Sequence, residues 1–168
     1  MTTCPQAGSC AKYCYARRGT YKFKVVDTAY ERRLQYTKLD SFHELMNYEI
    51  AINKVTHLRI HDSGDFYDSA YLNKWLKIIN ENKHVQFYAY TKQVRLFQTY
   101  KLLGYIPDNF TVIYSLGGKE DDRINIDTER HSKIFKSLDD LVAAGYSDAS
   151  NNDLIAMGDN HKIGLLAH

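Results

Sequence analysis

The sequence predicts one α/β domain, built on a mainly parallel sheet of about five strands with flanking helices. The length of 168 residues is close to that of one domain, and 44% hydrophobic with 25% charged residues is typical of a globular protein. Stretches rich in β-branched and aromatic residues alternate with stretches of helical spacing, which is typical of βαβ units. We expect a single domain over residues 1–168, with a loop over 1–20 and the α/β body over 21–168.

The expected helices follow from apolar spacing and from their end signals. Residues 26–39 and 42–52 show helical spacing, and Asp40 with Ser41 gives a capping signal for the second of these helices. A helix over 68–79 places Tyr71 and Trp75 on one face, with Asp68 as its N-cap. Two more helices are expected over 94–103, ending at Gly104, and over 138–144.

The expected strands are short apolar stretches between these helices. They cover residues 55–60, 84–90, 110–115, 132–135 and 163–166. Because helices separate most of them, neighbouring strands are expected to run parallel.

All three cysteines of the chain lie within its first 14 residues, at Cys4, Cys10 and Cys14, in the pattern C-x5-C-x3-C. An odd number of cysteines argues against a framework of disulfides. Buried core cysteines would be scattered along the chain instead of gathered in one segment. The pattern therefore favours a metal site, and Gly8 between the first two cysteines suits a tight loop around it.

Two kinds of metal site fit three clustered cysteines. Structural zinc takes four ligands, and the first histidine, His43, lies 29 residues beyond Cys14, so zinc would need a distant fourth ligand. Iron–sulfur clusters are held by thiolates, normally four of them. We expect a [4Fe-4S] cluster held by the three cysteines, which leaves one iron open to substrate or water.

Polar residues follow three of the expected strands, in segments 61–67, 90–92 and 115–118. In a parallel sheet, ligands bind beyond the carboxyl ends of the strands, so we expect these segments to converge beside the cysteines. His61 and Asp65 are the expected acid–base groups, and Lys92 is the third expected catalytic residue, placed to offset negative charge.

Five further residues are expected to bind substrate. Arg17 and Arg18 follow the last cysteine and would clamp an anion or carboxylate, with a solvated basic turn as the alternative. Tyr90, Ser115 and Gly117 stand at strand ends, and a glycine there would let a ligand approach the backbone closely.

Three stretches of the chain resemble a known family. They are CPQAGSCAKYCYA from residue 4, LRIHDSGDFY from residue 58 and YAYTK from residue 88, and they are similar to a phage family called gene product eighty-eight. The resemblance implies a viral protein related to radical S-adenosylmethionine (SAM) enzymes, with a trimmed partial barrel. It also implies that Cys4, Cys10 and Cys14 ligate a [4Fe-4S] cluster, with Tyr13 as the aromatic residue beside the last cysteine.

Three functions are compatible with such a site. The first is hydrolysis of a small ester-type substrate, with the open iron as Lewis acid. The second is a radical SAM reaction, in which SAM is cleaved at the open iron. The third is a non-catalytic metal-binding module for nucleic acid or a host protein, with Tyr15 and Tyr21 beside basic residues. We expect the hydrolase first, because about five strands are fewer than the six of a partial barrel.

Charge and hydropathy limit the partners. The chain has 22 Lys and Arg against 20 Asp and Glu, a net charge of +2, which does not call for a nucleic-acid partner. No apolar run is long enough to span a bilayer. We therefore expect a soluble protein in the reducing cytoplasm of an infected host cell, acting on a small molecule, and make no prediction of its oligomeric state.

Overall fold

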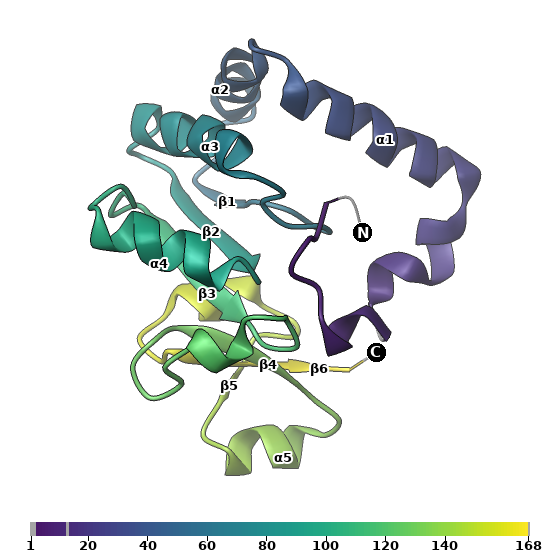
Figure 1. The fold of residues 1–168 in the computed structure, drawn as a ribbon, viewed down its shortest axis with the longest axis vertical. Coiled ribbons are helices and arrows are strands. Elements are labelled where there is room, and N and C mark those ends of the chain that lie inside the picture. Colours follow the sequence, from purple (N-terminus) through teal and green to yellow (C-terminus); the bar gives the residue numbers. More distant parts are fainter. Residues whose placement is uncertain (1–2, 13, 168) are drawn as a thin grey trace.

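A six-stranded parallel sheet, curled into a half-barrel, organises residues 3–12 and 14–167, the part of the chain that the computed structural model describes (Figure 1). The strands stand in the order β1-β2-β3-β4-β6-β5. They are β1 (His57–Arg59), β2 (Gln86–Thr91), β3 (Phe110–Ser115), β4 (His131–Phe135), β5 (Ser147–Asp148) and β6 (Lys162–Leu166). The predicted α/β class and parallel sheet are confirmed. The strand that the sequence did not predict is β5, which pairs with β6 at the edge of the sheet.

Five α-helices lie within the described residues, each at a predicted position. They are α1 (Lys24–Lys38), α2 (Phe42–Ile52), α3 (Ser69–Glu81), α4 (Val94–Leu102) and α5 (Leu138–Ala143). The N-cap role of Asp68 is confirmed, because its carboxylate accepts the N–H of Tyr71 at 2.7 Å. The capping signal before α2 marked the right position, since the helix begins directly after Ser41, but the side-chain hydrogen bond of a cap is absent. Ser41 occupies the N-cap position with φ −77° and ψ 4°, outside the extended region in which a side chain reaches back to the first turn, and makes no such bond.

Side chains of the strands alternate between two faces of the sheet. On β2, Phe87 and Ala89 belong to the main core, which the buried faces of α2, α3 and α4 complete. Tyr88 and Tyr90 point to the other face, where a smaller cluster includes Ala156 of the 3-10 helix η5 (Asp153–Met157). The helices therefore cover one face, and the second face is closed only in part.

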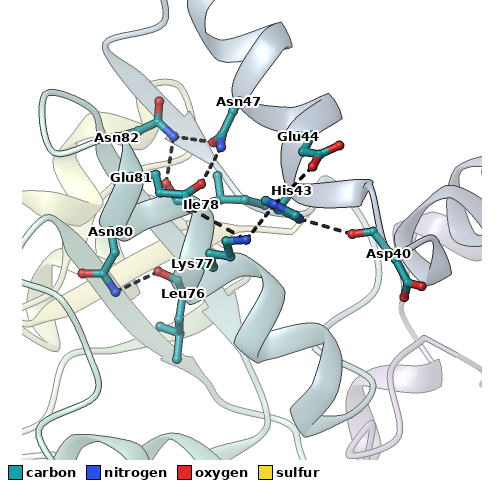
Figure 2. A network of polar contacts seen from close by, with 10 residues as sticks. All are labelled: Asp40, His43, Glu44, Asn47, Leu76, Lys77, Ile78, Asn80, Glu81 and Asn82. Atoms are coloured by element: carbon teal, nitrogen blue, oxygen red, sulfur yellow. Dashed lines mark hydrogen bonds and ion pairs between the residues drawn. The ribbon is translucent and has the colours of Figure 1, made fainter.

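A polar network joins α2 to α3 at the outer surface (Figure 2). The ammonium of Lys77 lies 2.7 Å from Nε2 of His43, and Asn47 donates to the carboxylate of Glu81 at 2.6 Å. Asn82, at the end of α3, donates to the side-chain oxygen of Asn47 at 2.7 Å. These contacts fix the two helices against each other and contribute nothing to the strand ends.

Residues 3–12 and 14–38 form an arm at the edge of the half-barrel (Figure 1). The expected loop contains three 3-10 helices, η1 (Ser9–Lys12), η2 (Tyr15–Arg17) and η3 (Gly19–Lys22), and α1 follows directly. None of these four elements has a fully buried residue. The arm is therefore held by contacts with the strand ends and, through Lys74 of α3 and Thr37 of α1, with the helices, and not by fully buried core residues.

Candidate functional site

The cysteine segment, residues 3–14, lies against the carboxyl ends of β1 and β3. The carbonyl of Thr3 accepts the N–H of Asp65 at 2.6 Å, just beyond β1. The carbonyl of Gly117, just beyond β3, accepts the N–H groups of Gly8 and Cys10, both at 3.1 Å. These bonds place the cysteines at the edge of the sheet where α/β proteins bind ligands. Tyr13, which belongs to this segment, lies outside the described residues.

Two glycines allow this close approach of two backbones. A Cβ atom on Gly8 would stand 2.6 Å from the carbonyl oxygen of Gly118, which no side chain tolerates. Gly117 has a φ of +97°, and a Cβ atom there would lie 3.0 Å from Cβ of Cys10. The sequence predicted a close approach at Gly117, and what approaches it in the structure is the cysteine segment.

The three polar strand ends meet beside this segment. The carboxylate of Asp65 accepts the Thr91 hydroxyl and the Lys92 N–H, each at 2.7 Å, which joins the ends of β1 and β2. The ammonium of Lys92 donates to Oγ of Ser115 at 2.7 Å, to its carbonyl at 2.9 Å and to the Leu116 carbonyl at 3.3 Å, which joins β2 to β3. Asp65, Lys92 and Ser115 therefore form one chain of hydrogen bonds across three strands.

These hydrogen bonds occupy most of the donors and acceptors of Asp65, Lys92 and Ser115. Asp65 is only 2% exposed, and its Oδ1 also accepts the N–H of Phe66 at 2.7 Å. Burial raises the pKa of Asp65 to about 6, although hydrogen bonds from Lys92, Thr91 and Phe66 act in the opposite direction. Lys92 has three donor protons, and all three contacts are internal. Both residues thus hold the strand ends together.

The three thiols are free and half-buried. Burial raises the pKa of the Cys4 thiol to about 11, and the negative charges of Asp65, Cys10 and Cys14 act in the same direction. Among the described residues, no three His, Cys, Asp or Glu side chains stand close enough to share one metal ion.

Three thiols without a fourth cysteine are a donor set that would suit a [4Fe-4S] cluster with one open iron. A four-iron cluster is a large group whose thiolate ligands stand further apart than the ligands of one zinc ion. Three thiols on a segment that is hydrogen-bonded to two strand ends would hold such a group without a fourth protein ligand. Binding would displace the thiol protons, so affinity would rise with pH.

His61 turns away from the cysteines and into the main core. Its ring packs edge-on against Phe66, with centroids 4.6 Å apart, and Nε2 lies 3.1 Å from the hydroxyl of Tyr71. Burial, assisted by the charge of Arg59, lowers the pKa of His61 to about 4. The imidazole is therefore neutral at physiological pH. Nδ1 is buried and has no hydrogen-bond partner among the described residues.

Asp62 is an acidic neighbour of His61 that was not among the expected catalytic residues, and it ties the arm to the sheet. Its carboxylate accepts the hydroxyls of Tyr21 at 2.7 Å and Tyr30 at 2.8 Å, and its carbonyl accepts the hydroxyl of Tyr15. The ring of Tyr21 packs on Tyr15 and Tyr30, with centroids 5.6 and 5.8 Å apart. Burial alone would raise the pKa of Asp62, but the two hydroxyls and nearby arginines lower it below its ordinary value.

The expected substrate-binding residues lie in three places. Arg17 and Arg18 are exposed on the arm, and their guanidinium groups donate to backbone carbonyls of η1. Tyr90 lies on the second face of the sheet, where Arg59 stacks over its ring at 4.9 Å and its buried hydroxyl has no partner among the described residues. Ser115 and Gly117 stand with the cysteine segment. Within the described residues, no contact joins Arg17 or Arg18 to Tyr90.

The second face carries an ion pair that the sequence did not predict. Arg59 of β1 pairs with Asp153 of η5 at 2.7 Å, and Tyr88 donates to the same carboxylate at 3.3 Å. The two charged residues are 94 positions apart in the sequence, and they meet only because the sheet is curled. The register of β1 against β2, in which Arg59 stands opposite Tyr88, is the signal that could have indicated that these two residues share a face.

Fold and site together define a class: an α/β half-barrel with a three-cysteine segment at the carboxyl ends of its parallel strands. The chain belongs to the gene product 88 family, whose model matches residues 1–168, and this supports a phage origin. Comparisons with curated proteins and with solved structures gave no match. In the described residues, no helix has the length and hydropathy needed to cross a membrane.

Proposed function

We propose that this chain is an iron–sulfur enzyme in which Cys4, Cys10 and Cys14 hold a [4Fe-4S] cluster with one iron open to a small-molecule substrate. One observation carries the proposal: the cysteine segment is hydrogen-bonded to the carboxyl ends of β1 and β3 in a six-stranded parallel half-barrel. Ligands bind at this edge in α/β sheets, and three ligands leave one iron without a protein donor.

The reaction that the geometry supports best is the reductive cleavage of SAM. Such a cluster, when bound and reduced, supplies one electron to the sulfonium of SAM, whose carbon–sulfur bond breaks to release methionine and a deoxyadenosyl radical. This reaction needs no acid–base residue, and the sheet has the six strands of a partial barrel, where the sequence predicted about five. The chain's own residues hold the strand ends in register through Asp65 and Lys92.

Ester hydrolysis at the open iron is the second candidate. Asp65 favours it, because a carboxyl group with a pKa of about 6 beside Cys4 titrates in the range that suits a general base near neutral pH. Against this, Asp65 and Lys92 are engaged in internal hydrogen bonds and His61 lies in the core. Proton transfer would therefore require Asp65 to exchange one of these bonds for a bond to substrate.

The test is anaerobic reconstitution with iron and sulfide, followed by electron paramagnetic resonance (EPR) of the dithionite-reduced protein without and with SAM. A SAM-dependent change of the signal, together with release of methionine and deoxyadenosine, supports the first reaction. A signal indifferent to SAM, with turnover of a nitrophenyl ester that Cys10→Ser abolishes, supports the second. Zinc in place of iron, or no metal, overturns the proposal.

A further inference from the structure

Charge is distributed very unevenly along this chain. Residues 12–38, here called the basic arm, contain eight Lys and Arg against two Asp and Glu, a net charge of +6. Since the whole chain carries +2, the remaining residues carry −4. A near-neutral total therefore conceals a basic segment beside an acidic body.

The eight cations of the basic arm are free to meet a partner. All eight side chains are exposed: Lys12, Arg17, Arg18, Lys22, Lys24, Arg32, Arg33 and Lys38. Within residues 3–12 and 14–167, none of them forms an ion pair with a carboxylate. Uncompensated like charges repel one another and destabilise a fold. Since α1 has no fully buried residue, this cost is not offset by packing of the helix.

Aromatic and apolar side chains are exposed among these cations. Phe23, Val25 and Tyr36 are 59%, 76% and 48% exposed. Arg32 and Tyr36 are four residues apart on α1 and so share a face. A shallow hollow on the same helix is lined by Lys24 and Arg32, with Val25, Thr28 and Ala29 between them. One face of α1 thus presents two cations, an apolar floor and an aromatic ring.

We infer that the basic arm binds single-stranded nucleic acid, independently of sequence, along η3 and α1. Lysines and arginines neutralise the phosphates of a strand, and exposed aromatic rings stack on its bases. The combination favours a single strand over a duplex, because paired bases do not offer their faces to a side chain. This function goes beyond the proposed reaction, and it uses none of the cysteines or strand-end residues.

The test is fluorescence anisotropy of a labelled 20-nucleotide single strand titrated with the full chain at several salt concentrations. We expect the triple variant Lys22→Ala, Lys24→Ala and Arg32→Ala to weaken binding on the order of tenfold. It should also reduce the slope of log affinity against log salt by about 2. Lys101→Ala, Arg123→Ala and Lys136→Ala remove the same charge from exposed positions elsewhere and should leave affinity within about twofold.

The contribution of stacking is tested separately. Tyr36→Ala should weaken binding at least about fivefold, whereas Tyr48→Ala, which removes an exposed tyrosine from α2, should have no effect. Absence of binding by the unmodified chain at 50 mM salt, or an equal loss in both triple variants, would overturn the inference. Equal affinity for a duplex with no effect of Tyr36→Ala would overturn the single-strand assignment. Circular dichroism checks that every variant is folded.

Discussion

His61 combines an unusual backbone with a buried Nδ1 that has no hydrogen-bond partner in the part of the chain that the structure describes. Its φ of +72° lies in the left-handed region, which residues other than glycine rarely adopt. The ring fills the core beside Phe66 and Tyr71, and this packing stabilises the unusual conformation. Because the sharp turn at His61 directs Asp62 toward the tyrosines of the arm, its role in the structure is first of all positional.

The low pKa of His61 predicts a pH dependence of stability. The unfolded chain binds this proton at about pH 6.5 and the folded chain only at about pH 4, so stability is full above pH 6.5 and is lost as pH falls toward 4. Between pH 7 and pH 4.5 we expect the free energy of unfolding to fall by roughly 2–3 kcal/mol more than in His61→Asn. Urea unfolding at the two pH values measures this. If the free energy of unfolding changes equally with pH in the unmodified chain and in His61→Asn, His61 is not the source of the pH dependence.

Asp62 also predicts that stability falls at low pH, but here because the folded chain stabilises the charged form of the side chain. Its pKa lies below the ordinary value in the folded chain, so its carboxylate stabilises the protein above about pH 4, and the contribution is lost as pH falls through the folded pKa. Asp62→Asn should cost about 1 kcal/mol at pH 7, because the site is partly exposed, and nothing at strongly acidic pH. Asp108→Asn, at an exposed position, is the matched control. Equal stability of the two variants at pH 7 would refute the role of Asp62.

At the level of elements, predictions succeeded where a pattern is local. The bounds of α2 and β3 agree with the predicted 42–52 and 110–115, because apolar spacing and burial coincide there. The edge strand β5 was missed, since two residues carry no period and its pairing depends on β6. The meeting of residues 115–118 with the cysteines was expected, but the backbone hydrogen bonds from Gly8 and Cys10 to Gly117 were not, because they join residues more than 100 positions apart.

Gly8 tests whether that contact holds the cysteines in place. Gly8→Ala inserts a methyl group against the carbonyl of Gly118, so the segment must move away from β3. We expect a loss of about 1–3 kcal/mol in stability and a lower iron content after reconstitution. Ser9→Ala, at the exposed next position, should change neither quantity. Full iron retention in Gly8→Ala would show that the contact is not needed.

At the level of the whole molecule, the candidate site was predictable in its position but not in its bonding. Cysteine clustering and the rule that ligands bind at strand ends brought Cys4, Asp65, Lys92 and Ser115 to one edge. That Lys92 donates to Ser115, and that His61 faces the core, depends on side-chain directions that only the packed structure fixes. The contrast between the basic arm, at +6, and the rest of the chain, at −4, can be counted from the sequence, but the total of +2 does not show it.

Iron and acid-labile sulfide contents of the anaerobically reconstituted chain decide whether the three cysteines hold a cluster. We expect about four irons and four sulfides per chain, as a [4Fe-4S] cluster requires. Cys4→Ser, Cys10→Ser and Cys14→Ser should each lower both contents, while Ser9→Ala retains them. Undiminished iron and sulfide in any of the three cysteine variants would contradict the assignment of that cysteine. Iron without sulfide in the unmodified chain would contradict the cluster itself.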